Sequence, residues 1–295
     1  MIWLVGNRGM LGTEVEKLLR QHDLPYISSD KEVDITDQDQ LKQFVFDKPI
    51  SWIINCSAYT AVDKAEDEPE LAFRINADGP RNLAGIALNK GAKLIHISTD
   101  YVYDGTKEGK YVETDTPHPL GVYGASKYQG EIYIQNLLKE HFIVRTSWLY
   151  GKHGNNFVYT MLRLFRERDE VLVVGDQWGA PTYAPDLAGT LLEIVRLNSD
   201  AYGIYHFTNE GTVSWFDFAC EICSLAQKKK LLTKDVQIKR IATEDYPTRA
   251  HRPHNSCLSK EKIRSTLNLM LRPWQMRLQA FLAEIESFET TTHNN

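Results

Sequence analysis

Apolar and polar positions alternate in two different periods through the first half of the chain. Short, nearly continuous apolar runs predict buried strands, and the stretches between them repeat apolar residues at helical spacing. A strand–helix alternation of this kind is typical of βαβ units with a parallel sheet. The expected strands cover 2–6, 24–30, 51–58, 93–100 and 142–151, and the expected helices cover 13–22, 36–46 and 69–90.

The pattern becomes mixed beyond residue 150. Helices are expected near 155–168 and at 185–198, 259–267 and 274–288, with strands at 171–177 and 203–208. We therefore predict an α/β protein with a Rossmann-type doubly wound parallel sheet in residues 1–150. Residues 151–287 are predicted to form a smaller C-terminal α/β substrate-binding lobe, with helix 185–198 returning to the first domain and a frayed tail at 288–295.

Composition places the chain among soluble globular proteins, because 42% of its 295 residues are hydrophobic and 25% are charged. The net charge of −5 gives no reason to expect a nucleic-acid partner. No apolar run approaches the roughly 18 residues that a membrane helix needs. We expect a cytoplasmic location and no membrane association.

Four cysteines do not suggest a disulfide scaffold. Cys220 and Cys223, together with His251, His254 and Cys257, have residue types and spacings that could bind zinc. The segment around Cys220 and Cys223 also has the pattern of an amphipathic helix, in which both would serve as small apolar residues. We favour the helix.

A glycine-rich turn follows the first predicted strand directly. Three glycines spaced as G-x-x-G-x-x-G open the first helix, which is where a dinucleotide pyrophosphate binds backbone amides at a helix N-terminus. An ordinary tight turn is the alternative. The predicted cofactor-binding residues of this turn are Gly6, Asn7, Arg8, Gly9, Met10, Leu11 and Gly12.

The residues that would meet the adenosine give conflicting signals about the cofactor. Asp30, at the end of the second strand, can accept hydrogen bonds from a ribose and favours NAD. Arg8 could instead pair with the 2′-phosphate of NADP. Asp34 and Ile35 are positioned to flank the adenine, or simply to lead into the next helix.

Tyr123 and Lys127 are four residues apart in "YGASK". On a helix this spacing puts both side chains on one face. An ammonium group beside a phenol favours the phenolate, so Lys127 should lower the pKa of Tyr123 toward the range in which a general acid works well. Such a pair is often surface decoration, but after a dinucleotide-binding half it indicates catalysis.

These segments resemble the extended short-chain dehydrogenase/reductase superfamily and, within it, the dTDP-4-dehydrorhamnose reductase family. The resemblance extends over essentially the whole chain. "GNRGMLG" and "YGASKYQGE" are shared by many superfamily members, whereas "STDYVYDG" and "DQWGAPT" are specific to the reductases. The resemblance implies NADPH- or NADH-dependent reduction of the C4 keto group of dTDP-4-dehydro-L-rhamnose, in dTDP-rhamnose synthesis for cell-surface polysaccharide.

The resemblance also implies a catalytic set of Thr99, Tyr123 and Lys127, with Tyr123 as proton donor. Strand alternation sends Ser98 and Thr99 to opposite faces, so Ser98 would face the cofactor or the core. Further cofactor contacts would be Cys56, Ser57, Ala58, Tyr59, Asn76 and Ser98. Substrate contacts would be Thr99, Asp100, Tyr101, Trp148, Asn156, Gln177 and Arg252.

Some alternatives stay open. Trp148 could be a core residue, Arg252 could form a surface salt bridge, and Tyr59 stands where many family members have histidine. A 4,6-dehydratase or 4-epimerase is one rival, although Tyr101 replaces the second carboxylate that such dehydratases carry after Thr-Asp. A non-catalytic NADP-binding regulatory subunit, like that of methionine adenosyltransferase, is another. The resemblance suggests a homodimer and, in some members, Mg²⁺ dependence, with no ligands assignable.

Overall fold

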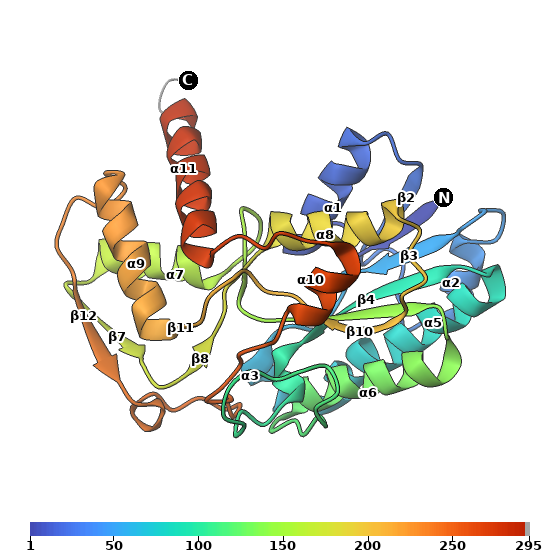
Figure 1. Cartoon of the computed structure of the whole chain (residues 1–295), viewed down its shortest axis with the longest axis horizontal. Coiled ribbons are helices and arrows are strands. Elements are labelled where there is room, and N and C mark those ends of the chain that lie inside the picture. The colour runs from blue at the N-terminus through green and yellow to red at the C-terminus, as the bar shows by residue number, and fades with distance from the viewer. Residues whose placement is uncertain (293–295) are drawn as a thin grey trace.

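A parallel sheet of six strands forms the first unit of the computed structural model, which describes residues 1–292 (Figure 1). The strand order is β2-β1-β3-β4-β5-β10, so the direction of winding reverses between β1 and β3. Ligands of open α/β sheets bind at the carboxyl ends of the strands beside such a reversal. The strands are β1 (Ile2–Val5), β2 (Tyr26–Ser29), β3 (Trp52–Asn55), β4 (Lys93–Thr99), β5 (His141–Thr146) and β10 (Gly203–His206).

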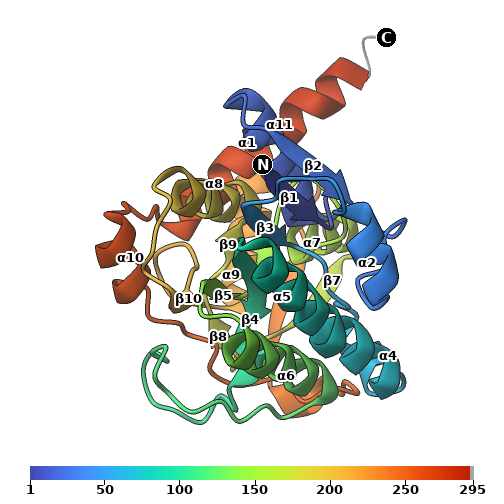
Figure 2. The ribbon, with the colours of Figure 1, turned by 90° about the vertical axis from the view of Figure 1, so that its right-hand side faces the viewer.

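Helices cover both faces of this sheet (Figure 2). On one face lie α1 (Met10–Gln21) and α8 (Ala184–Arg196); on the other lie α2 (Gln38–Phe44), α5 (Gly79–Lys90) and α6 (Val122–Leu137). The alternation within β1 explains the two layers. Leu4 packs in the core beneath α1 and α8, whereas Trp3 packs in the core beneath α2 and α5. The predicted doubly wound Rossmann-type fold is confirmed.

Three segments from the second half of the chain complete this first unit. The predicted helix 185–198 is α8, and its leucines share a core with β1 and α1. β10 pairs in parallel with β5, and α10 (Glu261–Leu267) adds Ile263 and Leu267 to the same core. β10 and α10 lie in the part of the chain predicted to form the C-terminal lobe, yet both pack in the first unit.

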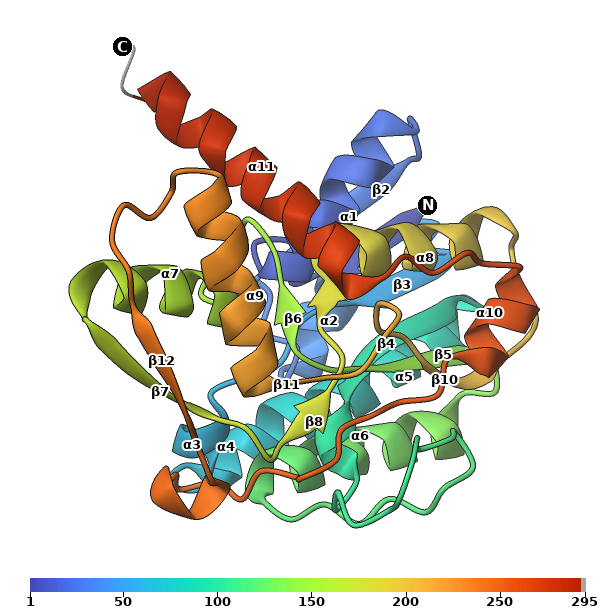
Figure 3. The same ribbon diagram turned by 60° about the vertical axis from the view of Figure 1, so that its left-hand side comes forward.

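A second, separate core holds the remaining elements together (Figure 3). The predicted apolar stripe of the last helix is confirmed, because Trp274, Leu278, Phe281 and Leu282 are all buried there. Cys223 lies in the same core. The elements are α7 (Phe157–Glu167), α9 (Trp215–Lys228), α11 (Trp274–Thr292), β6 (Leu149–Tyr150), β7 (Glu170–Val174), β8 (Trp178–Gly179), β9 (Thr182–Tyr183), β11 (Val213–Ser214) and β12 (Gln237–Ile241).

Several sequence expectations need correction. The strand expected over 142–151 is broken, because Trp148 adopts a φ of +49° between β5 and β6. The backbone of α11 continues to Thr292, and residues 293–295 lie outside the described residues, so the expected fraying of the tail stays a prediction. The expected helix 69–90 is α4 (Pro69–Phe73), a π-helical turn at Arg74–Asp78, and α5. Through residue 292, none of the helices has the length and apolar character required to span a bilayer.

Candidate active site

The glycine turn has the geometry that a dinucleotide site requires. Gly6 has a φ of +80°, and a Cβ there would lie 2.7 Å from the backbone nitrogen of Ser57. A Cβ on Gly12 would lie 2.0 Å from the carbonyl oxygen of Gly6. Both positions therefore demand glycine. The turn, which leads into an α1 N-terminus capped by no side chain, lies next to Cys56 and Ser57, just after β3.

Some side chains around the glycine turn form internal contacts, and others are exposed at the surface. Asn7 donates to Glu16 and Ser28, and Leu11 is buried in the core under α1. Asp30 accepts from the backbone amide of Arg8 at 3.0 Å. The guanidinium of Arg8 is exposed and lies 3.6 Å from the Glu32 carboxylate. An exposed side chain at this place can turn toward the 2′-phosphate of NADP.

The segment after β2 places Asp34 and Ile35 differently. The Asp34 carboxylate accepts from the backbone amide of Thr36, which fixes the turn into α2. Ile35 is buried against α5, where a Cβ on Gly79 would lie 2.4 Å from its Cδ1. Ile35 thus serves the core in this structure.

Helix α6 approaches the end of β4 very closely. A Cβ on Gly124 would lie 2.1 Å from the carbonyl oxygen of Tyr101, so the glycine of "YGASK" allows this contact. Glu66 accepts from the first helical amide, that of Val122. As a result, the rings of Tyr101 and Tyr123 meet edge to face, with centroids 5.6 Å apart.

Ser98 and Thr99, neighbours at the end of β4, have different hydrogen-bond partners. The Ser98 hydroxyl donates to Glu131 in the core. Of the two surroundings that the sequence leaves open for Ser98, the cofactor site and the core, this is the core. Thr99 donates to Asp100 at 3.0 Å and accepts from the amide of Tyr101. Burial raises the pKa of Tyr123, and the nearby hydroxyl of Thr99 has a smaller, opposite effect.

The side chain of Lys127 is held against β4. Its Nζ donates to the carbonyl oxygen of Ile97 at 2.6 Å and lies 3.2 Å from Nε2 of His96. After burial, the groups that shift the pKa of Tyr123 are Thr99, Asp100 and Tyr101. The expected lowering of this pKa by Lys127 stays a prediction. Burial lowers the pKa of Lys127 itself to about 8.

Asn76 organises the approach to the site from the π-helical turn. Its amide oxygen accepts from the backbone of Tyr59, and its amide nitrogen donates to the Tyr59 carbonyl and to Ser126. Asn76 thereby ties the loop after β3 to α6. The Tyr59 hydroxyl donates to Glu68.

Arg252 reaches the site from the C-terminal part of the chain. Its guanidinium donates to Asp63 at 2.8 Å and also contacts Tyr101. This ion pair joins the loop of the second half to the short helix α3 (Val62–Ala65). Asp63 was not predicted, and nothing in its sequence context distinguishes it.

Trp148 occupies the boundary between the two units. Its ring stacks on Trp215 with centroids 3.5 Å apart, and a Cβ on Gly179 would lie 2.7 Å from it. The glycine of "DQWGAPT" therefore provides the space in which the Trp148 ring lies. The partly buried ring is compatible with both roles that the sequence leaves open.

Two predicted substrate contacts have structural partners. Asn156 caps α7 by accepting from Tyr159 and donates to the carbonyl of Gly151. Gln177 is buried and donates to Thr243. Within residues 1–292, neither Asn156 nor Gln177 has a hydrogen bond to Thr99 or Tyr123.

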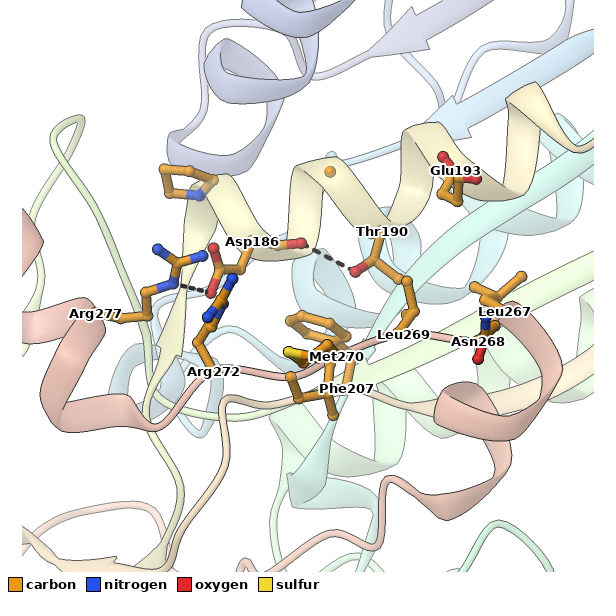
Figure 4. Close-up of a pocket in the computed structure, with 13 residues that line it drawn as sticks. Asp186, Thr190, Glu193, Phe207, Leu267, Asn268, Leu269, Met270, Arg272 and Arg277 are labelled. Atoms are coloured by element: carbon orange, nitrogen blue, oxygen red, sulfur yellow. Dashed lines mark hydrogen bonds and ion pairs between the residues drawn. The ribbon is translucent and has the colours of Figure 1, made fainter.

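A cavity of about 370 Å³ lies elsewhere, between α8 and the segment that joins α10 to α11 (Figure 4). Arg277 points at Asp186 there, with a 2.6 Å hydrogen bond. None of the predicted site residues lines this cavity. Within residues 1–292 no three histidine, cysteine or acidic side chains cluster to hold a metal ion, so the zinc alternative has no support.

Comparisons with known proteins agree with this geometry. The family described as RmlD substrate binding domain matches residues 1–287. A dTDP-4-dehydrorhamnose reductase from Aggregatibacter actinomycetemcomitans is 43% identical, covering 96% of this chain and 98% of its own. The structure of one from Clostridium acetobutylicum has a TM-score of 0.91 at 39% identity, covering 97% of this chain and 99% of its own.

The structure of a dTDP-4-dehydrorhamnose reductase from Bacillus anthracis, in complex with NADP, is 42% identical. It has a TM-score of 0.89 and covers 96% of this chain and 98% of its own. The glycine turn, the packing of α6 against the end of β4 and these full-length similarities lead to one conclusion. The chain belongs to the RmlD substrate binding domain family and is similar over nearly its whole length to dTDP-4-dehydrorhamnose reductases.

Proposed function

We propose that this chain reduces the C4 keto group of dTDP-4-dehydro-L-rhamnose to give dTDP-L-rhamnose, using NADPH or NADH. The observation that carries the proposal is the close packing of α6 against the end of β4, which brings the Tyr123 ring edge to face with that of Tyr101, two residues after Thr99. β4 lies in the sheet whose first strand delivers the glycine turn. The named activity of the relatives supports the substrate.

The residues around the glycine turn fit a dinucleotide. The close approach of Gly6 to Ser57 and the uncapped start of α1 suit a pyrophosphate, while Asp30 and Arg8 lie at the ribose end. A bound reduced nicotinamide supplies the hydride. The Bacillus anthracis relative, whose structure holds NADP, supports use of the phosphorylated cofactor.

The side chains of the chain supply protonation and charge stabilisation. Thr99 donates its hydroxyl proton in a hydrogen bond to the substrate carbonyl, and Tyr123 transfers a proton to the oxygen as it becomes an alkoxide. Because burial raises the pKa of Tyr123, this group is a protonated donor at neutral pH. Asp100, Tyr101, Trp148 and Arg252 are proposed to contact the sugar nucleotide, with Arg252 exchanging Asp63 for the diphosphate.

Turnover of dTDP-4-dehydro-L-rhamnose with NADPH and with NADH tests the proposal. Tyr123→Phe should lower kcat by about 10²–10⁴, the usual contribution of a general acid, and leave cofactor binding intact. Full turnover by Tyr123→Phe would remove Tyr123 as proton donor. Redox-neutral conversion of another sugar nucleotide would indicate the dehydratase or epimerase. Cofactor binding without any turnover would indicate the regulatory subunit.

Finer expectations belong to the same proposal. We propose a homodimer that works in the cytoplasm and supplies rhamnose for a cell-surface polysaccharide. Light scattering measures the mass in solution, and a monomeric mass at working concentration would contradict the dimer. Addition and chelation of Mg²⁺ during turnover test the metal dependence that the resemblance suggests.

A further inference from the structure

A line of buried polar groups crosses the sheet toward Lys127. Asn55 on β3 and His96 on β4 are register partners, so their side chains lie on the same face of the sheet. Both side chains are fully buried, and Lys127 is 2% exposed. The line starts at Ser57, against which the glycine turn packs. In so dry an environment each hydrogen must have an acceptor.

The orientation of the Asn55 amide is fixed by its neighbour. The backbone nitrogen of Ser57, which can only donate, lies 3.0 Å from Oδ1 of Asn55, and the Ser57 hydroxyl donates to the same oxygen. The amide nitrogen of Asn55 therefore faces Nδ1 of His96, at 3.0 Å. An amide nitrogen is a donor, so Nδ1 of His96 must accept and carry no hydrogen.

The remaining ring nitrogen then has a defined role. Burial lowers the pKa of His96 well below its usual value, so the ring is neutral. A neutral imidazole whose Nδ1 accepts has its hydrogen on Nε2. That hydrogen faces Nζ of Lys127 at 3.2 Å. An ammonium group has no lone pair to accept it, whereas a neutral amine can accept it and still donate to Ile97.

We propose that His96 is a positioning residue that donates Nε2–H to Lys127 and stabilises the neutral amine of that lysine. The effect of this contact on catalysis rests on the proposed function. In the proposed reaction the Tyr123 phenolate has to regain a proton, and if that proton comes by way of the Lys127 ammonium, the lysine is a neutral amine for that step. Solvent then returns the proton to Lys127. His96 holds the amine between these two steps.

The other charged and titratable groups around Lys127 do not replace His96. Glu131, one turn further along α6, favours the ammonium, as does Cys56 after β3, but burial outweighs both. Glu131 is itself held by Arg145 in a bidentate pair and by Ser98. Its charge is thus largely committed to Arg145, and among the hydrogen-bond contacts of residues 1–292 His96 is the group that faces Lys127 with a ring N–H.

The tautomer of His96 can be observed without any turnover. In the NMR spectrum of protein labelled with ¹⁵N-histidine, the signals of one imidazole ring should disappear in His96→Gln. In wild type that ring should carry its hydrogen on Nε2 and none on Nδ1. Asn55→Asp replaces the amide donor by an acceptor, so the same ring should carry its hydrogen on Nδ1. A wild-type His96 ring with Nδ1–H, or an imidazolium at neutral pH, would overturn the proposal whatever the substrate turns out to be.

The pH profile of turnover tests the effect on Lys127. His96→Leu removes the donor, so the alkaline limb of kcat should move up by about one pH unit, the value of one hydrogen bond. Asn55→Asp should also move it up, because Nε2 becomes an acceptor for the ammonium. His96→Gln retains a donor near Nε2 and should keep the wild-type profile.

A purely structural role of His96 would give a different result. His96→Leu would then lower kcat or stability with the alkaline limb unmoved, and His96→Gln would resemble it. Either result contradicts the proposal. If His96→Leu does not fold, the Asn55→Asp profile and the tautomer measurement decide the question. Absence of turnover in wild type would refute the proposed function and leave the tautomer result standing.

Discussion

At the scale of single residues, Asp100 carries the least compensated charge of the site. Its Oδ1 accepts from Thr99, but its Oδ2 is buried and has no hydrogen-bond partner within residues 1–292. Burial raises the pKa of Asp100 to about 6, against the weaker lowering by the hydroxyls of Ser256 and Thr99. Ionisation at neutral pH therefore costs folding free energy.

Asp100→Asn should remove this cost. The folded pKa lies above the unfolded value, so the stability that the neutral carboxyl provides is present at low pH and lost as pH rises through about 6. The variant should gain stability over wild type between about pH 4 and pH 8, by up to roughly 3 kcal/mol. Urea unfolding at several pH values measures it. A difference independent of pH would show that Asp100 does not titrate in this range.

Arg8 decides between the two cofactors if its exposed guanidinium binds the 2′-phosphate. Arg8→Ala should raise the KM for NADPH about tenfold, the value of a hydrogen bond to a charged group, with little effect on NADH. Lys31→Ala, an exposed cation nearby, is the matched control and should change neither. An unchanged ratio of the two KM values in Arg8→Ala would exclude the assignment.

At the scale of elements, α6 packs very closely against the end of β4. Tyr123 can reach Thr99 only because Gly124 lets the helix lie against the carbonyl of Tyr101. A methyl group 2.1 Å from a backbone oxygen forces the helix or the end of β4 to move. A shift of about 1 Å in a catalytic group can cost on the order of 10²-fold in rate.

Gly124→Ala should therefore lower kcat by about 10²-fold while the glycine turn still binds the cofactor. Gly85→Ala in α5 is the matched control, since no atom lies within 4 Å of its added Cβ. That variant should keep wild-type turnover and gain about 0.4–1 kcal/mol in stability. Equal turnover of the two variants would show that the close packing of α6 does not position Tyr123.

The elements that the sequence predicts are those with a strong local period. Strands buried on both faces, such as β1 and β4, and amphipathic α11 follow directly from their apolar spacing. β12 is missed because it is a largely exposed partner of β7 alone, without an apolar run. His96 is missed because one histidine in an apolar strand has the appearance of core, and only the cross-strand register reveals Asn55 beside it. The break at Trp148 depends on its long-range stacking with Trp215.

At the scale of the whole molecule, the chain passes between its two units several times. After β5 it enters the second unit, returns for α8 and β10, leaves for β11 and α9, and returns once more for α10 before α11. Arg252 adds an ion pair to Asp63 across this connection. The two cores are separate, but neither is built from one continuous part of the chain.

This connectivity predicts that residues 1–150 do not fold alone, although all the proposed catalytic side chains lie within them. Without α8, β10 and α10, the apolar face of β1 and α1 that packs on α8 is exposed, including Leu4 and Val15, and β5 becomes an unpaired edge. An apolar face of that size is an aggregation hazard. The fragment should show no cooperative thermal transition by circular dichroism and no NADPH binding by fluorescence, where the full chain shows both. A fragment that melts cooperatively and binds NADPH would mean that α8 and β10 contribute only late packing, and that the nucleotide half is an independent domain.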